Sequence, residues 1–125
     1  MKSIDGLALL LVEDEYLIAL DAEEMLRELG AKTIEVVGTF EDAQTRTSEG
    51  TYDLAVLDVN INGKFSYPLA ANLKSRGIPF VFATGYGRHD HTLGEFQGTV
   101  CVSKPYTIDR LEKALRAALS ESATA

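Results

Sequence analysis

The sequence predicts an α/β fold in which a doubly wound parallel sheet is covered by helices on both faces. Short runs that are apolar at almost every position recur along the chain, as in strands buried on both faces. Between these runs, apolar residues recur at helical spacing. Strands that alternate with helices favour a parallel sheet with right-handed crossovers. Most of the runs also end on a polar or charged residue, where a strand would reach the edge of the sheet.

Five segments are predicted to be strands because they are rich in apolar and β-branched residues. In chain order they cover Leu7–Val12, Thr33–Val37, Tyr52–Asp58, Pro79–Ala83 and Thr99–Ser103. The third is mostly apolar and is expected at the centre of the sheet. The second is partly polar, which suits a strand at the edge of the sheet.

Helices are predicted between these strands. The first opens after the acidic residues 13–15, which suit the positive end of a helix, and closes at Gly30. Thr39 is expected to cap a second, rather polar helix that ends at Gly50. The third helix is expected over Pro68–Arg76, because proline is favoured in the first turn of a helix.

The last third of the chain contains a weak and a strong helical pattern. The glycine-rich segment 85–98 predicts that any fourth helix, between Arg88 and Phe96, is short or irregular. Thr107 is expected to cap a final helix with a continuous apolar face. That face consists of Ile108, Leu111, Ala114, Leu115, Ala118 and Leu119. Residues 120–125 are expected to form a frayed tail, so the core of a single domain over residues 1–125 covers about 7–119.

Composition limits the possible partners and the location. The net charge of −7 argues against nucleic acid or an anionic membrane as a partner. No stretch approaches the length of a membrane span. The single cysteine, Cys101, rules out an internal disulfide and favours a reducing, cytoplasmic location. We interpret Cys101 as a small core residue, and His89 and His91 as exposed loop residues without a third metal ligand.

Three carboxylates are expected at one edge of the sheet, because they lie at the ends of the first and third predicted strands: Glu13, Asp14 and Asp58. Like charges at this distance repel, and a hard divalent cation would resolve the repulsion. Magnesium prefers oxygen ligands and usually takes one or two carboxylates together with phosphate oxygens and water. We therefore expect Asp14 and Asp58 to bind Mg²⁺ (or Mn²⁺) directly. Glu13 would act through a metal-bound water, and the backbone carbonyl of Asn60 would complete the ligand set.

Two further polar residues, Thr84 and Lys104, follow the fourth and fifth predicted strands. Together with the carboxylates and one Mg²⁺, Lys104 brings the formal charge to about zero, so a phosphoryl group of about −2 could be accepted. Asp58 would be the nucleophile. Lys104 would neutralise charge on the transferred group, and Thr84 would donate a hydrogen bond to it. Gly85 would keep the approach to Asp58 open.

These residues together resemble the response-regulator receiver domain. Glu13-Asp14, Asp58, Thr84 and Lys104-Pro105 lie in the order and at the strand ends typical of that family, and the similarity covers residues 7–119. The resemblance implies a flavodoxin-like sheet with the strand order 2-1-3-4-5. The run Phe82–Gly87 also resembles a subgroup of single-domain regulators with a Phe-Ala-Thr-Gly signature.

The resemblance implies a function in two-component or phosphorelay signalling. A sensor histidine kinase or a histidine phosphotransfer protein would donate phosphate to Asp58, and the phosphorylated chain would signal to a downstream protein or act as a phosphate sink. The chain would catalyse only its own phosphotransfer and autodephosphorylation, without a separate substrate. Asn60 and Tyr86 are expected to tune the loss of phosphate, together with Gly85 and Pro105.

The sequence departs from the common family pattern in three places. The loop after Asp58 lacks the usual Met-Pro. Cys101 occupies a position where the family often has a switch aromatic, and Tyr86 is the candidate substitute. The weak fourth helix in segment 85–98 suggests an order–disorder change as the switch.

Two other functions are compatible with parts of the pattern. One is a receiver that works without phosphorylation as a protein-interaction module, which the complete acidic set argues against. The other is an aspartate-nucleophile phosphohydrolase of the dehalogenase type. That class needs a second aspartate two residues after the nucleophile, where this chain has Asn60, and it needs a cap domain.

Overall fold

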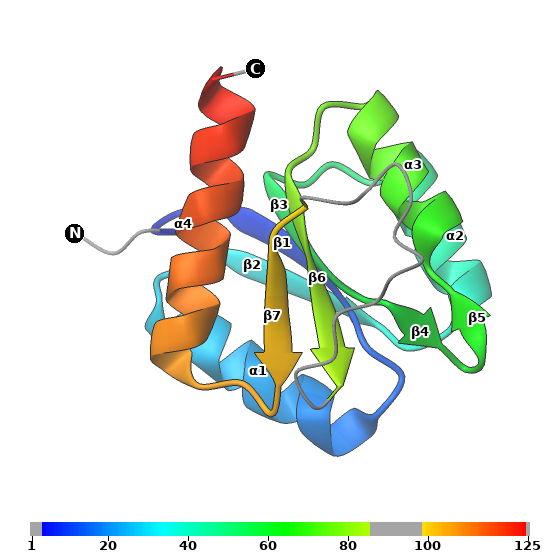
Figure 1. Cartoon of the computed structure of the whole chain (residues 1–125), viewed down its shortest axis with the longest axis horizontal. Helices are drawn as coiled ribbons and strands as arrows, with labels where there is room; N and C mark the ends of the chain where they lie inside the picture. The colour runs from blue at the N-terminus through cyan, green and yellow to red at the C-terminus, as the bar shows by residue number, and fades with distance from the viewer. Residues whose placement is uncertain (1–3, 86–98, 125) are drawn as a thin grey trace.

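A five-stranded parallel sheet forms the centre of the molecule, with the order β2-β1-β3-β6-β7 (Figure 1). The structure, a computed structural model, describes residues 4–85 and 99–124. The strands of the sheet are β1 (Ala8–Val12), β2 (Thr33–Val37), β3 (Leu54–Asp58), β6 (Phe80–Gly85) and β7 (Cys101–Lys104). Counted over these parallel strands alone, the order is 2-1-3-4-5, so the predicted fold class is confirmed.

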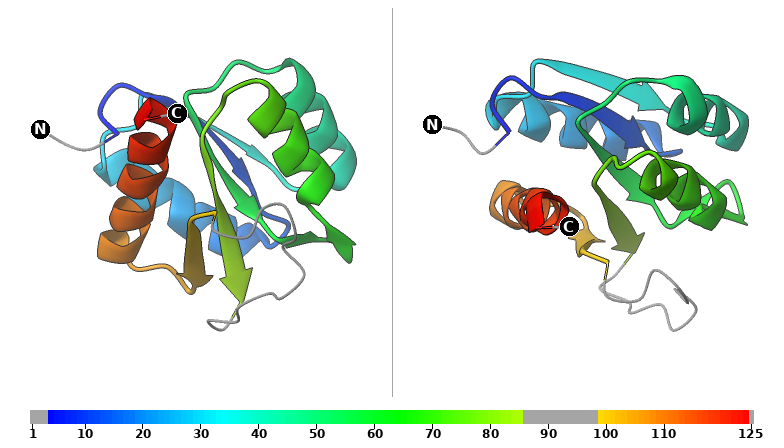
Figure 2. Two further views of the ribbon diagram at one scale, coloured as in Figure 1. Left: turned by 45° about the horizontal axis from the view of Figure 1, so that its top comes forward. Right: turned by 90° about the horizontal axis from the view of Figure 1, so that it is seen from above.

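Two pairs of helices cover the two faces of the sheet, and both further views show this layering (Figure 2). The helices are α1 (Tyr16–Glu28), α2 (Phe40–Glu49), α3 (Tyr67–Ser75) and α4 (Ile108–Thr124). Helices α1 and α4 lie on one face, and α2 and α3 lie on the other. The predicted fourth helix between Arg88 and Phe96 lies outside the described residues. The prediction of a frayed tail from residue 120 was wrong, because α4 continues to Thr124.

The central strands are apolar throughout because each of their side chains enters one of two cores. In β1, Leu9 and Leu11 face the core beneath α1 and α4, whereas Leu10 and Val12 face the core beneath α2 and α3. All four side chains are buried. Strand β2 lies at the sheet edge, and only Val37 of its residues is fully buried, which explains its mixed composition.

Local signals mark three helix ends at the predicted positions: the starts of α2 and α4 and the end of α1. The hydroxyl Oγ1 of Thr39 accepts a hydrogen bond from the backbone N–H of Asp42 at 3.1 Å, at the start of α2. Thr107 caps α4 in the same way, with its Oγ1 3.3 Å from the backbone nitrogen of Arg110. Gly30 follows α1 with φ +106°, a value that favours glycine. These contacts are local in sequence, so the residue pattern was sufficient to predict them.

A short antiparallel hairpin between β3 and α3 was not predicted. Its strands are β4 (Asn60–Ile61) and β5 (Lys64–Phe65). The turn residues Asn62 and Gly63 both have positive φ, at +51° and +86°. Two consecutive positive values are what a type I′ hairpin turn requires, and Asn-Gly is its preferred sequence. The turn chemistry of this loop was predicted from its Asn and Gly residues, but the strand pairing beside the turn was not.

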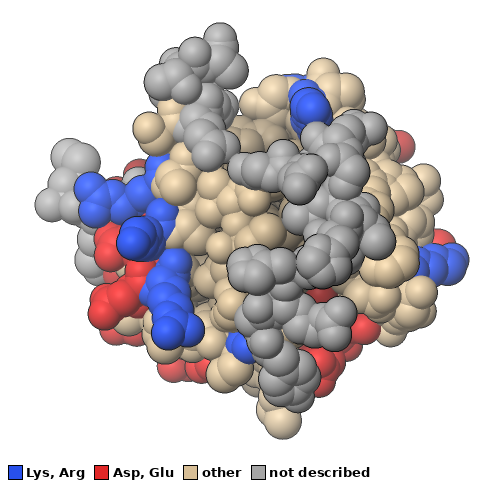
Figure 3. Space-filling model, in the orientation of Figure 1, with Lys and Arg blue, Asp and Glu red and all other residues tan. Residues whose placement is uncertain are grey.

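Charged side chains are unevenly distributed over the face that carries α4 and β7. Lys and Arg side chains form a row along the side that α4 occupies, and acidic side chains gather towards the edges of the face (Figure 3). Helix α4 carries Arg110, Lys113 and Arg116. The net charge of the whole chain is negative, but this row of side chains on its surface is positively charged.

In residues 4–85 and 99–124, no helix has both the length and the apolar character that crossing a membrane requires.

Candidate functional site

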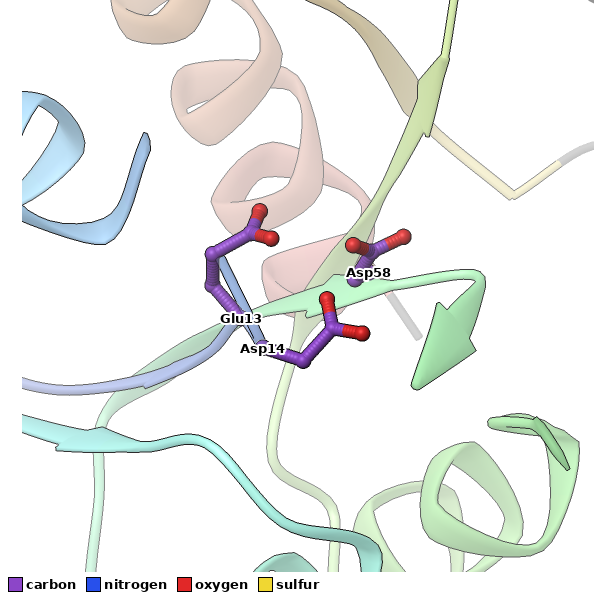
Figure 4. Close-up of side chains that lie close together, drawn as sticks. All are labelled: Glu13, Asp14 and Asp58. Carbon is purple, nitrogen blue, oxygen red and sulfur yellow. The ribbon is translucent and has the colours of Figure 1, made fainter. Parts of the chain in front are cut away.

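Three carboxylates converge at the carboxyl edge of the sheet, where the sequence placed them. Strands β1 and β3 are neighbours in parallel register, with Val12 opposite Leu57. The residues that follow these positions therefore meet, and the side chains of Glu13, Asp14 and Asp58 point towards one another (Figure 4). One ligand oxygen from each of the three lies within 4.8 Å of the others. The parallel arrangement of the two strands thus creates a concentrated negative charge.

Two of these carboxylates are almost removed from water. Glu13 is 2% exposed and Asp58 is 7% exposed, whereas Asp14 is more exposed than either. Burial and the nearby charge of Asp58 raise the pKa of Glu13 from 4.5 to about 7, against the lowering effects of Glu15 and Lys104. One of the lowering contacts is a hydrogen bond of 3.1 Å from the Glu15 backbone N–H to Oε2 of Glu13. The site therefore favours either a proton or a cation.

Lys104 supplies a positive charge to this cluster from the end of β7. Its Nζ lies 2.7 Å from Oδ2 of Asp58 and 3.1 Å from Oε1 of Glu13. Burial lowers the pKa of Lys104, but the hydrogen bonds and charges of Asp58 and Glu13 outweigh this effect and raise it overall. The amine is therefore held as an ammonium ion, in contact with the expected nucleophile.

Strand β6 places Thr84 and Gly85 beside Asp58. Asp58 is the register partner of Ala83, so Thr84 lies one residue further towards the carboxyl edge. Gly85 pairs with Lys104 on the other side of β6. Thr84 is buried, and a Cβ added to Gly85 would meet nothing within 4 Å. The strand order thus brings the predicted hydroxyl and the predicted amine to the same edge as the carboxylates.

Asn60 contacts the site through its backbone nitrogen. This N–H donates a hydrogen bond to Oδ1 of Asp58 at 3.2 Å, and the side-chain Oδ1 of Asn60 accepts one from Gly63 at 2.9 Å. The use of its backbone carbonyl as a metal ligand stays a prediction. Asn62, which the sequence analysis did not single out, donates its backbone N–H to Oδ2 of Asp14 at 2.9 Å. The Asn-Gly turn was the available signal for this contact.

Tyr106 is a further residue that the sequence analysis missed. It follows Pro105, which is joined to Lys104 by a cis peptide bond. Its hydroxyl is buried and has no hydrogen-bond partner among the described residues. Burial and the charges of Glu13 and Asp58 raise the pKa of the phenol. An aromatic residue two positions after Lys104 was the signal that could have drawn attention to it.

The prediction that Cys101 is a core residue was wrong. The predictions for Tyr86 and for the two loop histidines concern residues outside the described part of the chain. Cys101 is exposed rather than a core residue. Strand β7 is at the edge of the sheet, and the inward position beside Cys101 is taken by Val102, which packs against α4. Tyr86, the candidate switch residue, and the loop histidines at 89 and 91 lie outside the described residues.

The set of donors fits a hard divalent cation. It consists of carboxylate oxygens alone, two of the three carboxylates are buried, and one ammonium group is present to balance them. Oxygen donors of this kind suit Mg²⁺ or Mn²⁺ rather than softer metals. Asp14 and Asp58 would hold such an ion, with Glu13 close enough to act through water.

Comparison with known proteins agrees with this geometry. Residues 9–116 match the family described as the response regulator receiver domain. The two-component response regulator PhoP of Pseudomonas aeruginosa is 35% identical over 118 residues, which are 91% of this chain and 52% of that protein. The chain spans about half the length of the curated relatives it matches.

Two solved structures of one protein are more similar in sequence. The solution structure of SdrG from Sphingomonas melonis Fr1 is 40% identical with a TM-score of 0.78, and the match covers 96% of this chain and 99% of that one. The BeF3-activated conformation of SdrG, from Pseudomonas melonis Fr1, is 41% identical with a TM-score of 0.75, covering 90% and 95%. With the family match, the fold and the acidic site in agreement, this chain belongs to the response regulator receiver domain family.

Proposed function

We propose that this chain is a phosphoacceptor of a two-component or phosphorelay system, with Asp58 as the residue that is phosphorylated. The observation that carries the proposal is the environment of Asp58. Its carboxylate lies at the sheet edge, 2.7 Å from Nζ of Lys104, and one of its oxygens lies within 4.8 Å of oxygens of Glu13 and Asp14. A nucleophile, a cation to neutralise transferred charge and a set of metal-binding oxygens are thus present together.

The proposed reaction transfers a phosphoryl group from a phosphohistidine of a sensor kinase or a histidine phosphotransfer protein. A carboxylate oxygen of Asp58 forms a bond to phosphorus as the P–N bond breaks, and the electron pair returns to the imidazole nitrogen, which takes a proton from solvent. Lys104 moves its ammonium group from the carboxylate towards the phosphoryl oxygens, and Thr84 donates its hydroxyl hydrogen to one of them. Mg²⁺, if held by Asp14 and Asp58, would supply further positive charge for those oxygens.

The same site also catalyses the loss of the phosphoryl group by hydrolysis. Water attacks phosphorus, the Asp58 carboxylate leaves, and the proton from water goes to the released phosphate or to solvent. The chain then acts only on itself, so no separate substrate is needed. Asn60, Gly85, Tyr86 and Pro105 flank the reacting groups in sequence and are proposed to tune the rate of this step.

An apolar surface beside the site supports docking of a phosphodonor. Helix α1 begins two residues after Asp14, and its side chains Tyr16 and Leu17 are 75% and 77% exposed. Next to them, a hollow of about 440 Å³ is lined by Leu17, Ile18, Leu20, Asp21, Glu24, Pro105 and Tyr106. Contiguous exposed apolar surfaces often mark protein contacts. A donor that binds here would bring its phosphohistidine close to Asp58.

Phosphorylation by a small-molecule donor tests the proposal. The chain is treated with acetyl phosphate and Mg²⁺ and measured by intact-protein mass spectrometry, together with Asp58→Asn. We expect one labile phosphoryl adduct on the wild type, none without Mg²⁺ and none on Asp58→Asn. Asp53→Asn is the matched control: Asp53 lies at the other end of β3, where it accepts a hydrogen bond from the backbone of Ala8. This variant should be labelled normally.

Two results would contradict the proposal. Labelling of Asp58→Asn at the wild-type level would show that another residue accepts phosphate. A wild type that neither forms an adduct nor binds beryllofluoride in the presence of Mg²⁺ would favour the alternative, an interaction module that works without phosphorylation. Beryllofluoride serves here because it occupies the position of a phosphoryl group without requiring a donor.

A further inference from the structure

The β4–β5 hairpin is in direct contact with both carboxylates that are expected to bind the cation. The backbone N–H of Asn60 donates to Oδ1 of Asp58 at 3.2 Å. The backbone N–H of Asn62 donates to Oδ2 of Asp14 at 2.9 Å. Both donors belong to the backbone of one hairpin, so its conformation and the positions of the two carboxylates depend on each other.

The hairpin turn is fixed at several points, which gives it the rigidity to hold a ligand. Asn62 and Gly63 have the positive φ values of a type I′ turn. The side-chain Nδ2 of Asn62 donates to the backbone carbonyl of Gly38, in the loop after β2, at 3.3 Å. The N–H of Gly63 donates to Oδ1 of Asn60 at 2.9 Å. The turn is thereby tied to the loop after β2 and to its own first strand.

Asp14 depends on this turn more than the other carboxylates do. Glu13 and Asp58 are also held by Lys104, at 3.1 Å and 2.7 Å. Within the part of the chain that the structure describes, the hydrogen bond from Asn62 is the one that holds the Asp14 side chain. Asp14 is also more exposed than Glu13 and Asp58, so packing restrains it less.

We propose that Asn62 is a positioning residue for the cation-binding carboxylate Asp14. Its N–H holds Oδ2 of Asp14 and leaves Oδ1 available to the ion, while its side chain anchors the turn on Gly38. The inference rests on the proposed cation site. Substitution of a group that orients a metal ligand commonly lowers the affinity for the metal strongly. By reciprocity, a cation that binds Asp14 should also stabilise the hairpin.

Mg²⁺ affinity of the whole chain tests this role. It is measured by titration with MgCl₂, followed by the amide resonances of the sheet edge, in the wild type and in Gly63→Ala. Alanine disfavours the positive φ of this turn position, so we expect affinity to fall about tenfold. The matched control is Gly77→Ala: Gly77 has φ +71° and, like Gly63, an added Cβ there would meet nothing within 4 Å. Gly77 lies in the turn after α3, and its substitution should strain the backbone without changing Mg²⁺ affinity.

A second variant and a direct readout keep the test independent of folding defects. Asn62→Gly accepts the positive φ and retains the backbone N–H but loses the hydrogen bond to Gly38, so a smaller loss of Mg²⁺ affinity is expected. The amide proton resonance of residue 62 reports the bond to Asp14 itself. In wild type it should be shifted downfield by the carboxylate, and Asp14→Asn should move it upfield.

The outcomes separate this inference from the proposed function. A wild type that binds Mg²⁺, with Gly63→Ala and Asn62→Gly that bind it equally well, would overturn the positioning role and leave the phosphoacceptor site intact. A wild type that binds no Mg²⁺ would overturn the cation site, and this inference with it. If Gly63→Ala does not fold, the Mg²⁺ affinity of Asn62→Gly and the amide proton resonance of residue 62 test the positioning role instead.

Discussion

The ammonium group of Lys104 lies 2.7 Å from Oδ2 of Asp58, although the two residues are 46 positions apart. The same nitrogen is 3.1 Å from Oε1 of Glu13, which follows a different strand. One lysine at the end of β7 therefore bridges carboxylates from β1 and β3. Since both carboxylates are buried, this cation balances charge that is largely shielded from water.

Loss of this cation should destabilise the folded protein when no metal is present. Lys104→Met keeps a side chain of similar length but leaves Glu13 and Asp58 without their cation, and an unpaired buried charge is costly. We expect the free energy of unfolding at pH 8 in EDTA to fall by about 3 kcal/mol. At pH 5.5 the loss should be smaller, because Glu13 can then take up a proton. Urea denaturation followed by circular dichroism measures both values.

A surface ion pair provides the control for Lys104. Arg46 lies 3.0 Å from Glu35, and both side chains are more than 40% exposed. Arg46→Met should lower the free energy of unfolding by at most about 0.5 kcal/mol, because water screens exposed pairs. Equal losses in Lys104→Met and Arg46→Met would contradict the view that the cluster at the sheet edge is charged and desolvated.

The raised pKa of Glu13 predicts a pH dependence of stability with a definite sign. Its pKa is about 7 in the folded protein and 4.5 ordinarily, so between these values the folded state binds more protons than the unfolded state. The stability that the folded state gains by keeping Glu13 protonated is fully present below pH 4.5, and it is lost as the pH rises through 7. Over this whole pH range, the expected loss of unfolding free energy is about 3 kcal/mol.

Comparison with Glu13→Gln isolates this contribution. The free energy of unfolding is measured in EDTA at pH 5.5 and pH 7.5 for both proteins. The wild type should lose stability between these two values relative to Glu13→Gln, which has no titrating group at this position. Parallel curves for the two proteins would show that Glu13 has an ordinary pKa.

A change far from the site should affect stability alone. Thr39→Ala removes the hydroxyl that accepts the Asp42 N–H at the start of α2, which should cost about 1 kcal/mol. Thr39→Ser retains the hydroxyl and should recover most of this loss. Phosphoryl labelling of Asp58 should be unchanged in both variants. A defect in labelling without a loss of stability would indicate a link between α2 and the site that the contacts do not explain.

Most of the site could be predicted from the sequence because it depends on a regular feature of parallel sheets. Strand ends in such a sheet share one edge, so Glu13, Asp14, Asp58, Thr84 and Lys104 had to meet if the strands were placed correctly. The helix caps at Thr39 and Thr107 were equally accessible, because a cap joins residues three positions apart. Predicting the site residues and the helix caps requires only the local residue pattern and the direction of the strands.

The tertiary structure alone decided how these groups interact. The proton affinity of Glu13 depends on burial and on Asp58, neither of which is encoded next to it in the sequence. The exposure of Cys101 follows from the place of β7 at the sheet edge, not from its apolar neighbours. The contact of Asn62 with Asp14 joins residues 48 positions apart. Polar contacts over such distances are set by how the elements pack, whereas the periodicity of the chain determines only which elements form.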